Sequence, residues 1–382
     1  MFFSKPAQIS ASDRLFRSLS VGILKLSFLG LSTAGLMHSI PASALAIDSQ
    51  MIAPVTESLL STNGSRLQRA GFFADQGLQA FGRGDRSGAA QHWQRALALY
   101  QASGDRAGAG RMLENLSVLH RLNNEADEAI SLSEQAIALY EELGIADTQP
   151  SAYLNLGSAY RMSGRMEDAI ATYRRGLDLY QRAEDIQGER IMLSLLAQIH
   201  KDLSDYPQTI TYQHQALTLS REIGNAAAEA EALAELGYAY VMNEQPGEAI
   251  AALQPASEIY RQLRDRVQEV AVLNNLGKAA FLQKDYDLAM RSYEQALTIF
   301  QALNRPEQSA HVLINMGQVQ AAVNNVEGAI ASYQQAINLT ETLRRQSAEQ
   351  LSPRQEAAYR TLAILLQQQN RMAEAQQILS LI

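Results

Sequence analysis

The chain has 382 residues, of which 47% are hydrophobic, and its formal net charge is −8 at pH 7. It contains no cysteine, which excludes disulfides, cysteine nucleophiles and thiolate metal sites. Acidic residues outnumber basic ones by 40 to 32, and the basic residues are scattered, so nucleic acid is a disfavoured partner because phosphate binding needs gathered cations.

Residues 1–46 have the features of a signal peptide. The basic residues at its start are Lys5, Arg14, Arg17 and Lys25. An apolar stretch, 26–40, follows them, and Ala-Leu-Ala at 44–46 is a small-x-small cleavage site. We expect cleavage after Ala46, export to the periplasm or the medium, and no membrane span in the mature protein. The mature chain then carries a charge of about −11, because the four basic residues and Asp13 give the removed segment a local charge of +3.

The alternative to cleavage is a retained membrane anchor. The apolar stretch at 26–40 is interrupted by Ser27, Ser32, Thr33 and His38. Its fifteen residues are fewer than the ~20 that a helix needs to span a bilayer. We therefore expect the segment to be removed.

Residues 47–64 contain Ser, Thr, Asn, Gly and Pro54, which predicts a flexible linker. From about residue 65 to 344 the chain then repeats every forty residues, seven times. Three small residues recur in fixed phase in every repeat. The first, which we call the anchor, is Gly77, Ser117, Gly157, Ala197, Gly237, Gly277 or Gly317. The other two follow twelve and nineteen residues later and are alanine in most repeats.

The apolar spacing predicts two helices in each repeat. An apolar residue four before the anchor, and usually a leucine one before it, mark the first helix, helix A. The second half, as from Ala129 to Tyr140, has the apolar spacing of a second helix, helix B. Glycine inside a helix costs roughly 0.5–1 kcal/mol against alanine, so a glycine anchor indicates a close crossing of helices A and B. We expect Gly277→Leu to destabilise the protein more than Gly237→Ala. The leucine inserts a branched side chain into a helix crossing, whereas the alanine adds one methyl group and favours the helix.

The turns and the end of the chain have their own signals. Gly104-Asp105 and Gly224-Asn225 predict a helix stop followed by the cap of the next helix. Residues 345–382 are expected to hold the end of an extended helix B, near Gln350, and a capping hairpin that Pro353 opens and that is polar on its outer side.

These repeats resemble tetratricopeptide (TPR) repeats. In the third repeat the family pattern is matched by Tyr153, Leu156, Gly157, Tyr160, Ala169 and Tyr173. The forty-residue unit is similar to the extended repeats of kinesin light chains, and the last hairpin resembles the one that precedes a CHAT domain in secreted bacterial TPR proteins. The resemblance implies an all-α fold, a right-handed superhelix (α-solenoid) of helix-turn-helix repeats. The fourth repeat departs from the pattern at Ala197, His200, Thr209 and Gln213.

Little in the sequence points to catalysis, and we expect no enzyme, no cofactor and no metal. The glycine-rich stretch 82–88 is off by one from a dinucleotide-binding loop and follows a helix where a strand is required. His120 and His200 occupy the same position of two repeats, eighty residues apart. They are either structural histidines or paired metal ligands, and no carboxylate cluster recurs with them.

The resemblance places helix A on the concave side of the superhelix, where two of its positions are candidates for binding. Two residues before the anchor lie Asn115, Asn155, Asn275 and Asn315. Asparagine offers a donor and an acceptor, so such a ladder would pair with the backbone of an extended peptide. The alternative is that these asparagines bond between neighbouring helices.

Four residues after the anchor lie Arg121, Arg161 and Lys201, with Arg111 and Lys278 nearby. These cations would attract carboxylates of a partner, or they are ordinary solvated positions. We therefore expect an exported scaffold that binds a peptide or protein partner, acidic if the cations take part. The alternative function is a regulatory or adaptor module for a separately encoded protease or signalling enzyme.

Overall fold

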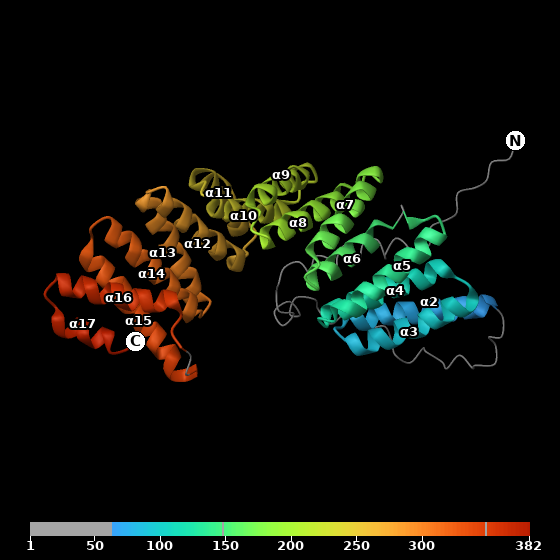
Figure 1. Ribbon diagram of the computed structural model, residues 1–382, viewed down its shortest axis with the longest axis horizontal. Coiled ribbons are helices and arrows are strands. Elements are labelled where there is room, and N and C mark those ends of the chain that lie inside the picture. Colours follow the sequence, from blue (N-terminus) through green and yellow to red (C-terminus); the bar gives the residue numbers. More distant parts are fainter. Residues whose placement is uncertain (1–62, 147–148, 348–349) are drawn as a thin grey trace. The chain divides into compact units, whose positions relative to one another are not determined.

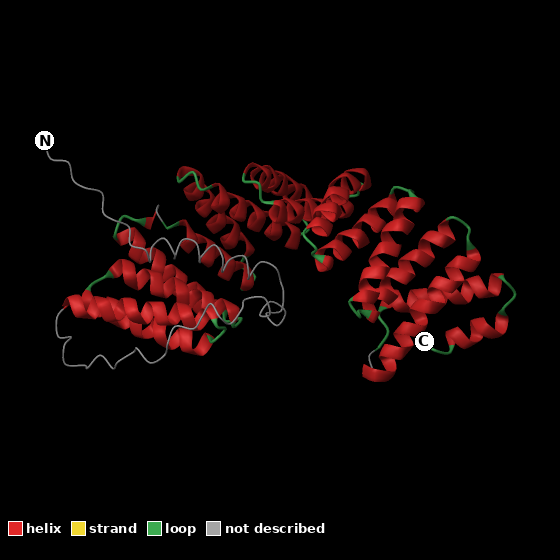
Figure 2. Cartoon of the chain, turned by 180° about the vertical axis from the view of Figure 1, so that it is seen from behind, coloured by secondary structure: helices red, strands yellow, loops and turns green. Residues whose placement is uncertain are grey.

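The computed structural model describes residues 63–146, 149–347 and 350–382, and within them the chain forms helices and no strand (Figures 1 and 2). The predicted signal peptide and most of the predicted linker lie outside the described residues. The A helices are α2 (Asn63–Gly82), α4 (Arg106–Leu122), α6 (Pro150–Met162), α8 (Ile186–Asp202), α10 (Ala226–Met242), α12 (Arg266–Leu282), α14 (Pro306–Ala322) and α16 (Pro353–Gln368). The B helices are α3 (Arg86–Ser103), α5 (Ala126–Glu142), α7 (Met166–Arg182), α9 (Tyr206–Glu222), α11 (Pro246–Gln262), α13 (Tyr286–Ala302), α15 (Val326–Ser347) and α17 (Met372–Leu379).

Each helix contacts the next one along the chain, so the hairpins stack in sequence order (Figure 1). The small residues twelve positions after the anchors are buried in all seven repeats, among them Ala89, Ala169 and Thr209. A single core cluster extends from Val270 in the sixth repeat to Ala375 in the last hairpin. The predicted all-α solenoid of helix-turn-helix repeats is confirmed, with a core that runs from repeat to repeat.

The anchor of helix A lies against the residue of helix B that follows sixteen positions later. A Cβ atom added at Gly277 would lie 2.5 Å from Tyr293 Cε1, and one added at Gly77 would lie 2.3 Å from Trp93. In the second repeat both positions are serine, and Ser117 Oγ and Ser133 Oγ are hydrogen-bonded at 2.7 Å. The glycine anchors therefore lie where helix A packs closely on helix B, as predicted, and the room that they leave is occupied by large side chains of helix B.

The structure shows how closely the anchor of the fifth repeat is packed. At Gly237 the facing residue is Leu253, which is fully buried, and an added Cβ would lie 2.3 Å from its Cγ. No room is left for the methyl group of an alanine unless Leu253 moves. Gly237→Ala therefore has a packing cost that the sequence did not show, and the expectation that it costs less than Gly277→Leu stays a prediction.

The turns between helices share one geometry, repeated every twenty residues. Most of these turns contain a residue with positive φ, in a series that begins at Gly84 and ends at Asn324. At Gly104 φ is 75°, and the next residue, Asp105, accepts a hydrogen bond from the backbone N–H of Gly108 at 2.8 Å. The predicted stop and cap are therefore present here. The same arrangement recurs at Gly224-Asn225, where Asn225 accepts from the backbone N–H of Ala228 at 3.1 Å.

The fourth repeat folds like the others although its sequence departs from the pattern. Thr209 and Gln213 of α9 are buried, and Thr209 Oγ1 donates to the backbone carbonyl of Asp205 at 3.0 Å. The threonine hydroxyl therefore finds a partner at the start of its own helix. Gln213 lies where most repeats have an aromatic ring, and its Oε1 is buried with no hydrogen-bond partner among the described residues.

The last hairpin closes the described stack. Helix α15 ends at Ser347, close to the predicted end near Gln350, and Ser352 and Gln355 cap each other's backbone at the start of α16. Gln367 and Gln368 are exposed as expected for an outer face, yet Ile364 and Met372 are exposed too. The outer face of this hairpin is therefore less polar than the sequence suggested.

Candidate functional site

The A helices of neighbouring repeats contact each other directly. Helix α4 contacts α6, α10 contacts α12, and α12 contacts α14, while no two B helices in the described part make contacts of that extent. The side of the stack on which the A helices lie is therefore the more closely packed one. We call it the inner face, and both predicted binding registers belong to helices that line it.

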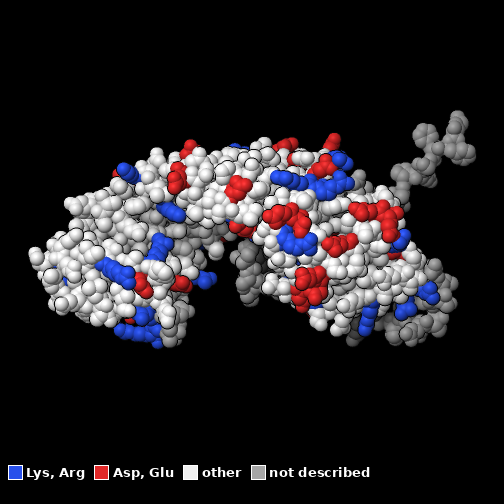
Figure 3. All heavy atoms as spheres, viewed as in Figure 1, with Lys and Arg blue, Asp and Glu red and all other residues white. Residues whose placement is uncertain are grey.

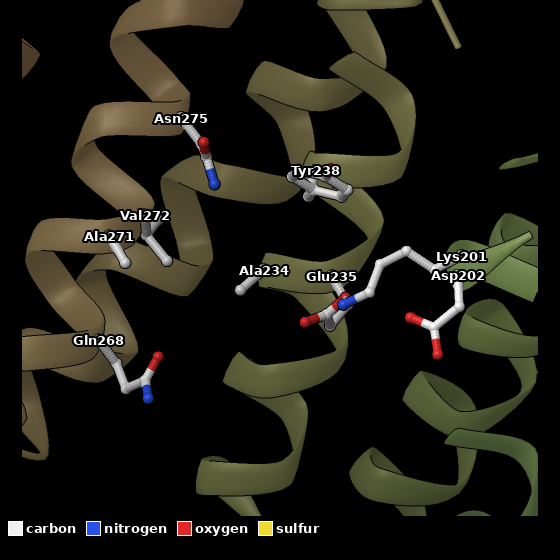
Figure 4. A pocket seen from close by; sticks show the side chains of 9 residues that line it. All are labelled: Lys201, Asp202, Ala234, Glu235, Tyr238, Gln268, Ala271, Val272 and Asn275. Carbon is white, nitrogen blue, oxygen red and sulfur yellow. The ribbon is translucent and has the colours of Figure 1, made fainter. Parts of the chain in front are cut away.

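A cavity of about 330 Å³ opens on the inner face between α8, α10 and α12 (Figure 4). Its lining residues are Lys201, Asp202, Ala234, Glu235, Tyr238, Gln268, Ala271, Val272 and Asn275. Two of them, Lys201 and Asn275, belong to the predicted registers, and the fold brings them together from two repeats. Gln268 and Asn275 extend from α12 toward α10 (Figure 4). The arrangement offers amide donors and acceptors beside small apolar side chains.

Sequence reasoning missed most of the lining of this cavity. Glu235 occupies the same position, two before the anchor, as the four predicted asparagines, so the register itself would have included it. Tyr238 follows its anchor by one residue, which is the position of Lys278 in the next repeat. The positions of Tyr238 and Glu235 within their repeat could therefore be found from the sequence. Neither residue, however, is of the type, asparagine or a basic residue, that marked a position as a candidate.

Two of the predicted cations form ion pairs between repeats. Arg161 Nε lies 2.8 Å from Asp202 Oδ2, and Arg161 Nη1 donates to Gln198 Oε1 at 3.3 Å. Lys201 Nζ lies 2.6 Å from Glu235 Oε2, and it also lies 5.7 Å from the centroid of the Tyr238 ring. The side chains of the two ion pairs are between 23% and 35% exposed, so they remain accessible on the inner face while joining α6 to α8 and α8 to α10.

The other predicted cations lie in different surroundings. Arg121 has a buried Nε with no hydrogen-bond partner among the described residues, and burial lowers the pKa of its guanidinium. Arg111 is half-buried near Glu114, where burial raises the pKa of the carboxyl and the Arg111 charge opposes that rise. Lys278 is exposed on α12, and no ion pair joins it to another described residue. Among the five cations, Lys278 is thus the exposed one.

The four asparagines differ in their contacts. Asn315 is buried, accepts a hydrogen bond from Arg354 of α16, and donates through Nδ2 to Asn274 Oδ1 at 3.3 Å. It therefore bonds between neighbouring helices, which is the alternative that the sequence left open. The Nδ2 atom of Asn115 is buried and has no partner in the described ranges. Asn155 and Asn275 are half-buried, and no hydrogen bond joins either side chain to another described residue.

A second group of charges lies on α8 and α10. Arg190 of α8 is 8% exposed, its Nε has no hydrogen-bond partner within the described part of the chain, and burial lowers its pKa. Burial raises the pKa of Glu231 on α10, while the charge of Arg190 lowers it. The fold therefore brings opposite charges near each other at the junction of the fourth and fifth repeats.

The two histidines of the same register have local roles. His120 Nδ1 lies 2.6 Å from Glu125 Oε2, and His200 Nδ1 lies 3.0 Å from Asp205 Oδ2. Each histidine thus contacts a carboxylate at the turn that follows its own helix. No group of three or more histidines and carboxylates in the described part of the chain is arranged to hold a metal ion. The histidines therefore lie apart, as parts of two separate turns.

Charge on the surface is mixed. On the face seen in Figure 3 basic and acidic side chains are interspersed, and most of the surface carries no charge. Such a face lacks the gathered cations that phosphate binding requires. Among residues 63–382, setting aside the four undescribed positions at 147–148 and 348–349, no helix combines the length and apolarity of a membrane span.

Comparison with known proteins places these repeats in a family. The profile of the tetratricopeptide repeat matches residues 188–262 and 268–342, which extend from α8 into α15. These two ranges are therefore tetratricopeptide repeats. A second profile, that of the soluble NSF attachment protein, matches residues 58–222. No curated protein sequence matches the chain.

Solved structures resemble the described repeats at low identity. One is the signal transduction ATPase with a tetratricopeptide repeat sensor from Pyrococcus horikoshii, with 14% identity, a TM-score of 0.60, and coverage of 84% of this chain and 46% of that one. Another is the apo form of RapI, with 11% identity, a TM-score of 0.53, and coverage of 72% and 99%. Kinesin light chain repeats from Podosopora anserina have 18% identity, a TM-score of 0.46, and coverage of 51% and 96%.

Proposed function

We propose that the chain is an exported, non-enzymatic scaffold that binds an extended peptide segment of a protein partner on its inner face. The observation that carries the proposal is the cavity between α8, α10 and α12, which Lys201 and Asn275 line together. The Asn275 amide has no hydrogen bond to another described residue, so its donor and acceptor are available to a peptide backbone. A repeat stack with an accessible row of A helices suits an extended ligand.

The binding test uses asparagines that the fold leaves available. Replacing Asn155 and Asn275 together by alanine should weaken partner binding without lowering the melting temperature, since each lost hydrogen bond is worth ~0.5–1.5 kcal/mol. Asn315 is left intact, because it bonds to Asn274 and Arg354. Asn338→Ala, at an exposed position of helix α15, is the matched control.

The partner is recovered by capture with the full chain from the fraction in which it is found, and its affinity for each variant is then measured by calorimetry. Unchanged affinity of the Asn155→Ala and Asn275→Ala double variant would place the binding surface away from this face. Recovery of one hydrolase or signalling enzyme would favour the adaptor role, whereas structural or envelope proteins would favour a scaffold.

Export is tested separately. The full chain is produced in a bacterium, and the mass and N-terminal sequence of the product are determined in each cell fraction. Export with cleavage predicts a product that starts at Ile47 outside the cytoplasm. A full-length product in the membrane fraction would support the retained anchor instead.

A further inference from the structure

Neighbouring repeats meet through two positions of their A helices. At the junction of the second and third repeats, Glu114, three before its anchor, lies beside Ser151, six before the next anchor, and Ser151 Oγ donates to Glu114 Oε1 at 3.3 Å. The corresponding pairs along the seven repeats are Ala74 with Arg111, Glu114 with Ser151, Leu154 with Ile191, Ser194 with Glu231, Ala234 with Ala271, and Asn274 with His311. Both members are alanine at one junction, between the fifth and sixth repeats.

The cavity of about 330 Å³ lies at this alanine junction. Ala234 and Ala271 both line it, and Val272 and the ring of Tyr238 complete its apolar part (Figure 4). At the junction of the third and fourth repeats, by contrast, Leu154 and Ile191 are both buried and occupy these positions. The alanine junction therefore lacks the two large aliphatic side chains that are buried at the junction of the third and fourth repeats. Apolar surface exposed in this way is stabilised when an apolar group covers it.

The polar residues around the cavity favour a ligand with an uncharged side chain at its centre. Lys201 is paired with Glu235, and Asp202 is paired with Arg161, so these charges already have partners. Asn275 contributes an amide free of hydrogen bonds to other described residues. An extended peptide can satisfy that amide through its backbone while one of its side chains enters the cavity.

Lys278 adds a charge outside the cavity. It follows Asn275 by three residues on α12, so both lie on the same face of the helix, about 4.5 Å apart along its axis. An extended peptide advances about 3.3 Å per residue, so Lys278 faces a residue one or two positions away from the one in the cavity. Lys278 is exposed and unpaired among the described residues, which suits a carboxylate there.

We infer that the Ala234–Ala271 junction binds one aliphatic side chain of an extended peptide, with the peptide backbone on Asn275 and a peptide carboxylate, one or two residues away, on Lys278. The inference rests on the proposed function and deepens it, because it names the repeat junction and the peptide chemistry. The occupant is a segment of a protein partner, since it must supply a backbone amide, an aliphatic side chain and a carboxylate together.

The test fills the cavity with the pair of side chains that is buried at another junction of the same protein. Ala234→Leu combined with Ala271→Ile copies the pair Leu154 and Ile191 of another junction, so the variant is expected to fold. Ala302→Ile, at an exposed position of α13, is the control for the added apolar group. A library of displayed twelve-residue peptides is selected on the full-length wild-type chain, and each selected peptide is measured against all three proteins.

We expect selected peptides to contain an aliphatic residue within two positions of an acidic one. They should lose at least tenfold in affinity on the filled variant and keep their affinity on the Ala302→Ile control. Equal affinity for the wild-type and filled proteins would overturn the inference while leaving peptide binding in place. Failure to select any peptide on the wild-type chain would overturn both this inference and the proposed function.

A second measurement does not depend on the filled variant. After residue 46 the chain has three lysines, Lys201, Lys278 and Lys284, which suits acetylation mapped by mass spectrometry. A bound selected peptide should slow acetylation of Lys278 and leave the exposed Lys284 unchanged. Lys278→Gln should weaken binding about two- to fivefold, the range of an exposed ion pair, and Lys284→Gln should not. Equal acetylation of Lys278 with and without peptide would overturn the carboxylate contact.

Discussion

Glu114 makes the stability of this protein depend on pH. The carboxyl is buried between α4, α5 and α6, where Tyr140 Oη donates to Glu114 Oε2 at 3.0 Å and Ser151 Oγ donates to Oε1 at 3.3 Å. Burial raises the pKa of Glu114 from 4.5 to about 7, against the opposing effects of these two hydrogen bonds and of the Arg111 charge. The folded protein therefore keeps a proton on Glu114 that the unfolded chain loses.

The sign and size of the effect follow from this shift. Between pH 4.5 and about 7 the folded state binds more protons than the unfolded state, so the free energy of unfolding falls as the pH rises. Each pKa unit corresponds to about 1.4 kcal/mol, so the full loss is roughly 3 kcal/mol. The loss is absent below pH 4.5 and complete above about pH 7.

Glu114→Gln removes the ionisable group and keeps an oxygen that can accept from Tyr140. The variant should be more stable than wild type at pH 8.5, by up to roughly 3 kcal/mol, and the difference should shrink toward zero at about pH 4.5. Urea denaturation followed by circular dichroism across this range measures it. Glu128→Gln, at an exposed position of α5, is the control. A variant that is less stable than wild type at pH 8.5 would refute the account of Glu114.

Three further predictions concern the repeat itself and are checked by thermal denaturation. Gly237→Ala should destabilise the protein by roughly 1–3 kcal/mol although alanine favours helices, because its Cβ would lie 2.3 Å from Leu253 Cγ, and a raised melting temperature would contradict this packing. Arg264→Gly should stabilise by about 1 kcal/mol, because φ at this turn is 58° and glycine adopts it without strain; a loss of stability would show that the arginine side chain contributes more than the backbone. Asp105→Ala should cost about 1 kcal/mol through loss of the cap on the Gly108 N–H, whereas an unchanged melting temperature would mean that water replaces it.

Much of the fold follows from local patterns in the sequence. The forty-residue spacing of small residues predicts the helix pairs, because a close crossing needs small side chains wherever it recurs. The crossing at Gly277 against Tyr293 bears this out, and the αL turn and cap at Gly104 and Asp105 were also predicted. Such features depend on residues within one repeat, so the sequence of that repeat contains the information for them.

The candidate site could be predicted only in part. The sequence identified the registers of Asn275 and Lys201, and the fold placed both on one cavity. It did not reveal that Lys201 pairs with Glu235, or that Arg161 pairs with Asp202, because these partners lie 34 and 41 residues apart. Which long side chain finds which carboxylate depends on the offset between stacked A helices.

The sequence by itself therefore determined the helices, their turns and the period of the stack, since these arise from contacts within about one repeat. The tertiary structure decided which residues of different repeats meet. Asn315 and Asn275 occupy the same register. In the folded protein Asn315 is hydrogen-bonded to Asn274 and Arg354, whereas Asn275 lines a cavity. The physical reason is that each junction is filled by side chains from two repeats, so a position is available for binding only where both sides contribute too little volume to close it.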